Sequence, residues 1–554
     1  MESAEVREAN RLENRKLRKV VLAASGGTIF EGYDFILFGT LAPLISRHFF
    51  ANVNETAGFI FTLLTFAAGF AIRPLGALIF GRMGDKSGRK RAFLITITIM
   101  GLSTFSIGLL PDYATAGIWA PVLLISLRLL QGLAFGGNYG GAVIYVAEHA
   151  PLRIRGFFVG CLQSAAGFAL FSSFLVIYIV RTMVGEAVFA DWGWRLPFLI
   201  SIGLLVISLW MRLALEESPV FKQMQAQGRA SKRPLSETFL EWRNAKLVLL
   251  VLFGLMAVQG VTWYTAHFYT QFFLSEILKV SPATVTGVMF IVTACGVPLY
   301  VLFAWLSDIV GRKPILLTGM LLAAVTAFPA FHLLAGAANP AMKVAIETAP
   351  VTVMADPRQC SLQFDPVGRA AFRSSCDIAK SALAKRGVSY HTQPAPDGAR
   401  ARIQIGGLTL DGLEGRGLSA PDLKQARTQF DGKLDAALMA AGYPLRADPR
   451  GVNLPLVTGI VLLYVLFAVM IYAPIPLMVC ELFPPRIRYS ALSLPYHIGS
   501  GWFGGFLPAV AFSMVAAKGD IYFGLWYPVV VTAVGIVVLA FLLPETKGRN
   551  LDGA

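Results

Sequence analysis

Long apolar stretches alternate with short polar gaps along most of this chain. About 20 apolar residues in a helix are enough to cross the hydrocarbon core of a bilayer, and about a dozen such stretches occur. They hold many Gly and Pro residues, which transmembrane helices tolerate where neighbouring helices satisfy the backbone. The pattern predicts spans at residues 20–47, 57–81, 92–110, 119–147, 156–180, 194–215, 246–275, 284–307, 314–336, 454–480, 489–516 and 521–543.

The alternation stops between residues 337 and 453, where Asp, Arg, Pro, Gly and Ala dominate. Short alternating runs at 401–405 and 408–412 predict strands, and the patterns at 374–386 and 421–441 predict helices. We therefore expect an all-α membrane protein of twelve transmembrane helices, with a small α+β domain inserted between helices nine and ten.

Two short motifs occur twice. The tract Gly-Arg-Met-Gly-Asp-Lys-Ser-Gly-Arg-Lys-Arg around Asp85 has an echo around Asp308, and Glu148-x-x-Pro-x-Arg-x-Arg recurs from Glu481. The members of the first pair are 223 residues apart, whereas those of the second are 333 apart. The two offsets predict a duplicated membrane core with about 110 extra residues inside its second half.

Composition and charge agree with a membrane protein. The chain is 55% hydrophobic and 15% charged, which excludes an ordinary soluble globule. Its net charge of +15 comes from Lys and Arg concentrated in alternate gaps and at both ends, so the positive-inside rule places both termini in the cytoplasm. The basic residues are dispersed over many short loops, which disfavours nucleic-acid binding. No cleavable signal peptide is recognisable at the polar N-terminus.

The inserted domain follows an odd-numbered span and should lie outside the cytoplasm, in the periplasm of a Gram-negative cell. The expected boundaries are 1–19 for the cytoplasmic N-terminal segment, 20–215 for the first six-helix half, 216–245 for a cytoplasmic linker, 246–336 for helices seven to nine, 337–453 for the inserted domain, 454–543 for helices ten to twelve and 544–554 for a cytoplasmic tail.

Two cysteines of the inserted domain, Cys360 and Cys376, are candidates for a disulfide in an oxidising compartment; two unpaired thiols are the alternative. His391 lies in the same domain, but these three residues lack the close paired spacing of a metal site, and we expect no metal. No nucleophile–base pattern is present, so the domain is not expected to be an enzyme.

Ionisable side chains inside the spans are the main functional candidates, because charges in hydrocarbon are costly. Glu31 and Asp34 are three residues apart and share one face of helix one. Arg73 and Arg128 are the cations embedded in helices two and four. Two acids facing two cations can neutralise each other, and these pairs can separate when an acid binds a proton or a cation binds an anionic substrate. Fixed structural ion pairing is the alternative.

The repeated tract has the features of a gate at the cytoplasmic helix ends. Asp85 and Arg89 are four residues apart and can pair, whereas Gly81 and Gly88 permit close helix approach and a tight turn. Charge pairs made in one state and broken in another would bias the direction of opening. Further gating candidates are Asp308, Arg312, Glu148, Arg155 and Glu481. These charges could instead serve only to fix topology.

Polar side chains in the spans are candidates for substrate contact, because transporters built from repeats bind substrate near the membrane midplane. They are Gln163, Tyr264, His267 and His497, with Tyr33 and Asn138 beside the charged positions. Tyr is also a common membrane-interface anchor, and a packing role is the commoner one for a buried His.

Several motifs together resemble the major facilitator superfamily, and within it the metabolite:proton symporter branch. They are the tract at 81–91 with its echo at 308–313, Gly-Thr-Ile-Phe-Glu-Gly-Tyr-Asp-Phe from residue 27, Arg-Pro-Leu-Gly from 73, Arg-Leu-Leu-Gln-Gly from 128, Gly-Gly-Asn-Tyr-Gly-Gly from 136 and Pro-Glu-Thr-Lys-Gly-Arg from 544. The resemblance covers the twelve-helix core and leaves the insertion unexplained.

The resemblance implies a multi-pass protein of the bacterial inner membrane that takes up a small organic anion with protons, needs no cofactor and draws energy from the proton gradient. Arg128, with Arg73, would hold the carboxylate, and Asp34 or Glu31 would carry the proton. One departure is that similar proteins carry Glu where this chain has Asn138. It keeps a proton-independent exchanger or an exporter as an alternative.

Two further alternatives concern the substrate and the class of protein. Relatives that transport zwitterionic osmolytes often carry a long heptad-bearing tail, which is not expected after residue 543. A non-transporting receptor with a periplasmic sensor domain is disfavoured by the gate motifs and the helix-one acids. The expected partners are the small anion, protons and the lipid bilayer, and a periplasmic partner of the inserted domain stays open.

Overall fold

A computed structural model describes residues 4–50, 65, 68–213, 216–361 and 372–551 of the protein. Within these residues, 11 helices are long and apolar enough to cross a membrane. The remaining expected span, residues 57–81, falls partly outside the described part of the chain, and its described portion runs into α3 (Arg73–Ser87). The prediction of a helical membrane fold is therefore confirmed.

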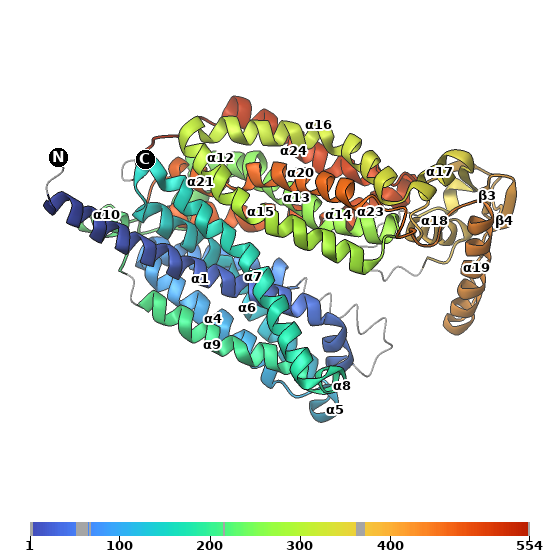
Figure 1. The fold of residues 1–554 in the computed structure, drawn as a ribbon, viewed down its shortest axis with the longest axis horizontal. Helices are drawn as coiled ribbons and strands as arrows, with labels where there is room; N and C mark the ends of the chain where they lie inside the picture. The colour runs from blue at the N-terminus through green and yellow to red at the C-terminus, as the bar shows by residue number, and fades with distance from the viewer. Residues whose placement is uncertain (1–3, 51–64, 66–67, 214–215, 362–371, 552–554) are drawn as a thin grey trace.

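The first half of the chain forms one group of helices, coloured blue to blue-green in Figure 1. Its members are α1 (Ala4–Phe49), α3, α4 (Arg89–Leu109), α5 (Tyr113–Ala116), α6 (Trp119–His149), α7 (Arg155–Val184), α8 (Glu186–Asp191) and α9 (Leu196–Leu213). The first helix begins 16 residues before its expected start at residue 20. Ala, Glu, Arg, Lys and Leu dominate this extension, and all five are strong helix formers.

The second half forms a similar group, coloured green to red in Figure 1, and follows the linker helices α10 (Pro219–Ala226) and α11 (Pro234–Phe239). It contains α12 (Trp242–Val251), α13 (Ala257–Tyr264), α14 (Thr270–Phe272), α15 (Pro282–Val310), α16 (Arg312–Ala338), α20 (Leu454–Tyr472), α21 (Ile475–Leu482), α22 (Arg488–Tyr496), α23 (Leu507–Lys518) and α24 (Trp526–Leu542).

Expected spans seven and eleven are interrupted by π-helical turns, which often mark functional positions in helices. They are η3 (Leu252–Met256), η4 (Thr265–Tyr269), η5 (Phe273–Ile277) and η7 (His497–Gly504). The two repeated tracts turn in the same way: Gly88 at φ 106° separates α3 from α4, and Gly311 at φ 118° separates α15 from α16. Such angles favour glycine, which explains its place in both copies.

The inserted segment, residues 337–453, holds a four-stranded sheet. Its elements are α17 (Pro340–Thr348), β1 (Val351–Ala355), α18 (Ser375–Lys385), β2 (Tyr390–Pro394), β3 (Arg402–Ile405), β4 (Leu408–Asp411) and α19 (Ala420–Ala440). The strand order is β2-β1-β3-β4, with β1 parallel to β2 and the other pairs antiparallel. Buried Val353, Leu383, Ile403 and Leu434 belong to a hydrophobic cluster separate from those of the membrane helices.

The sequence pattern located β3, β4, α18 and α19 but not α17, β1 or β2. The central strand β1 is only five residues long, and its alternation of buried Val351, Val353 and Ala355 with half-buried neighbours is too short to stand out.

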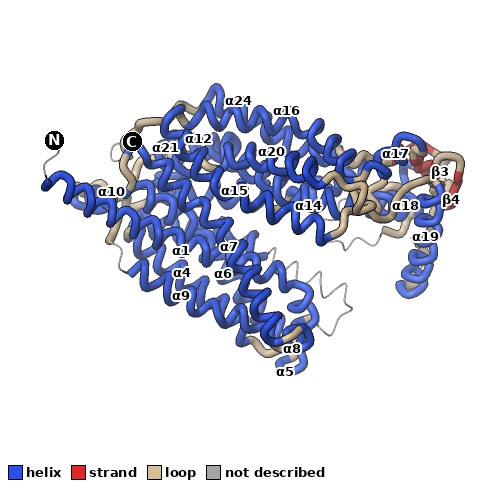
Figure 2. Tube along the Cα trace, in the orientation of Figure 1, coloured by secondary structure: helices blue, strands red, loops and turns tan. Residues whose placement is uncertain are grey.

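The helix bundle has two distinct ends. The start of α1 and helices α10 and α21 lie at one end, and strands β3 and β4 lie at the other (Figure 1). The two groups of helices lie together near the first end, where α3 contacts α22 and α7 contacts α15, and they diverge toward the sheet (Figure 2).

Candidate functional site

Neutral donors hold Asp34 at the centre of the first half. This carboxylate lies on α1 and is only 6% exposed. One of its oxygens, Oδ1, accepts hydrogen bonds from Thr104 Oγ1 on α4 over 2.9 Å and from Gln131 Nε2 on α6 over 2.7 Å. Neither donor was predicted from the sequence, although Gln131 lies three residues after Arg128 and therefore on the same helix face.

Arg128 reaches Asp34 mainly through the amide of Gln131. Its Nη1 donates to Gln131 Oε1 over 2.7 Å, whereas its distance to Asp34 Oδ2 is 3.7 Å. The guanidinium also lies over the ring of Phe38, 3.8 Å from the centroid. Because Gln131 Oε1 accepts from Arg128, the amide nitrogen must face Asp34. The expected pairing of Arg128 with Asp34 is thus present as a long contact with a bridging amide.

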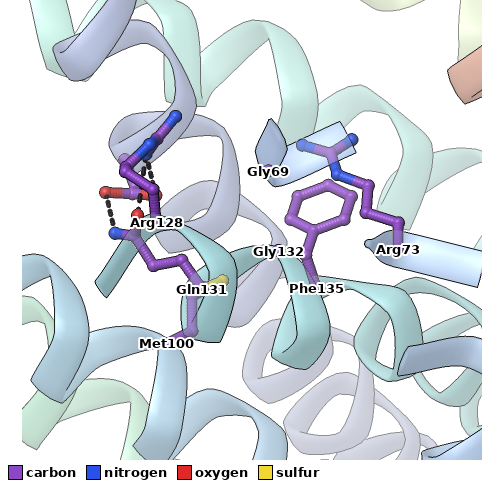
Figure 3. A pocket seen from close by; sticks show the side chains of 8 residues that line it. Gly69, Arg73, Met100, Arg128, Gln131, Gly132 and Phe135 are labelled. Atoms are coloured by element: carbon purple, nitrogen blue, oxygen red, sulfur yellow. Dashed lines mark hydrogen bonds and ion pairs between the residues drawn. The ribbon is translucent and has the colours of Figure 1, made fainter. Parts of the chain in front are cut away.

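Arg73 lines the same cavity from α3. Its guanidinium lies between the rings of Phe70 and Phe135, 3.9 Å from each centroid. Figure 3 shows Arg73 stacked on Phe135, with Arg128 and Gln131 directed at each other on the other side of the cavity. The lining residues are Asp34, Gly69, Arg73, Met100, Arg128, Gln131, Gly132 and Phe135. The free space is about 20 Å³, room for about one water molecule, so this conformation holds no organic acid there.

The second half presents neutral aromatic side chains. Trp263 Nε1 on α13 donates to the hydroxyl of Tyr300 on α15 over 2.9 Å, and the hydroxyls of Tyr472 and Tyr496 lie 3.3 Å apart. The ring of His497 is edge-on to Phe135, with centroids 6.0 Å apart. This ring contact places the start of η7 beside the residues that stack on Arg73.

The other expected substrate contacts occupy varied positions. Tyr264 packs against Trp263, and His267 stacks on Trp263 while its Nδ1 lies 3.0 Å from the carbonyl oxygen of that residue. Gln163 is buried within α7. Tyr33 is fully buried and donates to the carbonyl of Pro197, so in this conformation it packs α1 on α9 and does not line the cavity. The side chains of Glu31 and Asn138 lie outside the part of the chain that the structure describes.

Asp85 joins the two halves at the end of the bundle where α1 begins. Its carboxylate accepts from the backbone N–H groups of Tyr489 and Ser490, at the first turn of α22, and from Ser490 Oγ. Arg89 donates to Asp85 over 3.4 Å and also to the carbonyl of Pro485 across the two halves. Gly81 favours this close approach, because a Cβ there would lie only 3.1 Å from Ser490 Cα.

The repeated tract makes the equivalent contacts in the opposite direction. Asp308 accepts from the backbone N–H groups of Gly156 and Phe157 over 2.9 and 3.1 Å, at the first turn of α7. Arg312 pairs with Asp308 over 2.8 Å and with Glu481 over 3.1 Å. Each half therefore places a carboxylate on the N-terminus of a helix in the other half, where the helix dipole and free N–H groups favour an anion.

Glu148 and Arg155 complete this cluster. Glu148 accepts from Arg488 over 2.8 Å and from Ser218 of the linker, and Arg155 donates to the carbonyl of Arg549 over 3.3 Å. The structure thus brings the expected gating residues together, with Arg488 and Ser490 as partners that single-sequence reasoning did not identify.

Two further carboxylates missed from the sequence occupy helix starts. Glu217 accepts from the backbone N–H groups at the start of α4, and Glu545 does so at the start of α16. Burial raises the pKa of Glu545, but the backbone donors outweigh it and hold that pKa below its ordinary value. Glu545 lies in the Pro-Glu-Thr-Lys-Gly-Arg motif, which was the available signal.

Comparison with known proteins places this architecture among membrane transporters. The model of the family "Sugar (and other) transporter" matches residues 19–241 and 436–554. The proline/betaine transporter of Escherichia coli (strain K12) is 40% identical over 345 residues, which is 59% of this chain and 67% of that protein. The shikimate transporter of the same strain is 37% identical over 322 residues, 57% of this chain and 72% of that protein.

Solved structures show the same fold. The proton:xylose symporter XylE bound to 6-bromo-6-deoxy-D-glucose has a TM-score of 0.63 with 98% of each chain covered, at 16% identity. A partially occluded inward-open form of XylE from E. coli gives a TM-score of 0.55, with 97% of this chain and 100% of that chain covered, also at 16% identity. At this identity the likeness supports the fold alone.

Proposed function

Because this chain belongs to the sugar (and other) transporter family of the major facilitator superfamily, we propose that it takes up a small organic carboxylate together with protons. The matched relatives are transporters and not enzymes. Their family therefore also disfavours a non-transporting receptor. The geometry of the site bears on the two finer parts of the proposal, which are the substrate class and the coupling ion.

One observation carries the choice of an anion. Arg73 and Arg128 line one cavity together with Asp34. The aromatic side chains described in the second half are neutral. Guanidinium groups suit carboxylates because their paired N–H donors match both oxygens, so a substrate acid would fit this pair of cations.

The two oxygens of Asp34 are not equivalent, which supports a defined proton site. Oδ1 already accepts from Thr104 and Gln131, whereas Oδ2 faces Arg128 at 3.7 Å. A proton therefore binds at Oδ2, and the neutral acid no longer attracts Arg128. The freed guanidinium then accepts the substrate carboxylate. Proton binding before substrate binding couples the two fluxes.

The described conformation fits the stage before substrate is released inward. The cross-half contacts of Asp85 and Asp308 close the end of the bundle that the positive-inside rule assigns to the cytoplasm. We assign both termini to that side and the inserted segment to the periplasmic side of the bacterial inner membrane, as an α+β domain. Release inward requires these cross-half hydrogen bonds to break.

Uptake into proteoliposomes tests the proposal. Labelled shikimate, α-ketoglutarate, citrate, proline and betaine would each be supplied with and without an inward proton gradient. Accumulation of a carboxylate that disappears with the gradient supports symport. Uptake that does not depend on the proton gradient contradicts symport and favours an exchanger. Efflux driven by the gradient favours an exporter.

A zwitterionic osmolyte is the second candidate, and the aromatic side chains of the second half favour it. Trp263, Tyr300, Tyr472 and Tyr496 form a connected group on the second half. Aromatic faces attract quaternary ammonium groups, and a zwitterion would still present its carboxylate to Arg73 and Arg128. Gradient-driven accumulation of betaine or proline in the same panel, without accumulation of shikimate or citrate, would select this candidate.

A further inference from the structure

A second cavity lies where the inserted segment meets the second half of the bundle. Its volume is about 410 Å³. This is within the usual range of about 300–1,000 Å³ for small-molecule sites, which often form between structural units. We call it the junction cavity, and its lining residues are Lys279, Met342, Lys385, Arg386, Val388, Asp431, Asp435, Leu438, Tyr443, Pro444 and Leu445.

Hydrogen bonds attach the inserted segment to the second half, one group of them beside the junction cavity. The carbonyl of Lys279, just after η5, accepts from Ala447 N over 2.9 Å, and its Nζ donates to the carbonyl of Lys385 over 2.8 Å. Tyr390 N donates to the carbonyl of Gly519 between α23 and α24 over 2.6 Å. The inserted segment is therefore anchored to two separate loops of the second half.

Lys279 has an unusual backbone. It adopts φ 57°, and among the described residues no other non-glycine residue has a positive φ. This conformation costs a side-chain-bearing residue about 1–3 kcal/mol and persists where surrounding contacts enforce it. Lys279 is half-buried, and this burial lowers the pKa of its ammonium.

The charges around the junction cavity favour an anion. Arg386 pairs with Asp431 over 3.1 Å and with Asp435 over 2.5 Å, which leaves one negative charge among these three groups. Lys279 and Lys385 add two ammonium groups, so the charges of the lining sum to +1. The floor is apolar and buried, with Met342, Val388, Leu438 and Tyr443 each at most 3% exposed.

We propose that the junction cavity binds a small organic carboxylate, with the acid at the two lysines and an apolar or ring-shaped body on the floor. The inference stands apart from the proposed transport reaction, because the junction cavity and the Asp34 cavity share no lining residue. It gives the inserted segment a role in holding solute at the outer face of the protein.

Amine footprinting of the unmodified full chain in lipid nanodiscs tests the site. An amine-reactive ester would be applied with shikimate, benzoate or inorganic phosphate, and acylation of each lysine followed by mass spectrometry. At about ten times Kd, a bound acid slows acylation of Lys279 and Lys385 about tenfold, as its occupancy requires. Exposed Lys433 on α19 lies outside the junction cavity and serves as the matched control. Absence of protection by shikimate and benzoate, or equal protection by phosphate, overturns the proposal.

Equilibrium binding provides a second test of the junction cavity that does not depend on transport. Labelled shikimate or benzoate would be titrated into the Arg128→Ala protein, in which the central site is disabled. Residual binding that falls at least about tenfold in Lys279→Gln/Lys385→Gln, and is unchanged in Lys433→Gln, supports the junction site. Binding that survives the double substitution, or no binding in the Arg128→Ala protein, contradicts it.

Discussion

The carboxylate of Asp85 in the first half accepts from the backbone N–H of Ser490 in the second half over 2.9 Å, and from its hydroxyl over 2.8 Å. Asp308 repeats the relationship in reverse, on the first turn of α7. Each half thus caps a helix of the other. A closed end built from two reciprocal caps can open only when both carboxylates lose their N–H donors at once.

Replacing the first of these caps should loosen the closed end. Asp85→Asn removes the charge and one acceptor oxygen, and each hydrogen bond to a charged group contributes about 1.5–3 kcal/mol. We expect the open population at this end to rise roughly tenfold or more. Cys480, fully buried on α21, is a native reporter, and its maleimide labelling rate should rise in a Cys161→Ser/Cys295→Ser background.

Asp112→Asn is the matched control for this measurement. Asp112 also caps a helix start, accepting from Thr115 N over 3.0 Å, but it is only half-buried and precedes the short α5. Its substitution should leave Cys480 labelling unchanged. Equal labelling rates in the Asp85→Asn and unsubstituted proteins would remove Asp85 from the gate.

Asp34→Asn should separate accumulation from exchange. Asn cannot bind a proton at this position, but it keeps the size of the side chain and an acceptor for Thr104. Gradient-driven accumulation should be lost, while exchange of labelled for unlabelled substrate across the membrane continues. Accumulation at the original level would exclude Asp34 as the proton carrier.

Thr104→Val should shift the pH profile of uptake. The hydroxyl stabilises the charged form of Asp34, so its loss favours protonation, and uptake should persist to higher pH. A lost bond of about 1.5–3 kcal/mol corresponds to a shift of about one to two pH units. Thr98→Val is the control, because Thr98 donates only to the carbonyl of Leu94 on the same helix among its described bonds. A profile that moves to lower pH, or does not move, contradicts the assignment.

Arg73→Lys should weaken substrate binding without a comparable loss of turnover. Lys keeps the charge but cannot lie flat between Phe70 and Phe135, and each ring contributes about 0.5–1 kcal/mol. We expect KM to rise roughly tenfold and the maximal rate to change little. Arg181→Lys, at an exposed ion pair with Glu186, should alter neither value. An unchanged KM would place Arg73 outside the substrate site.

The disulfide between Cys360 and Cys376 should stabilise the inserted segment locally. It joins residues 16 apart, and closing a loop of this length contributes about 3 kcal/mol on the chain-entropy model. Cys360→Ser/Cys376→Ser should therefore make protease cleavage within residues 340–447 roughly a hundredfold faster. Cleavage at the original rate would show that other contacts alone hold this part of the segment.

The order of the helices was predictable from the sequence because spanning a bilayer is a local requirement. Apolar runs of sufficient length located α4, α6, α7, α9 and α24 to within a few residues. The two offsets between repeated motifs located the insertion, and Asp34, Arg73 and Arg128 stood out because charges are rare in such runs. Short strands such as β1 escaped, since five residues carry too little periodicity.

The partners of those charges were decided by tertiary structure. Thr104 and Gln131 reach Asp34 from 70 and 97 residues away, and Ser490 reaches Asp85 from 405 residues away. Spacing along the chain relates residues of one helix, but only helix packing determines which faces of different helices meet. For that reason the charged residues were visible in the sequence, whereas the bridging amide between Arg128 and Asp34 and the reciprocal helix caps were not.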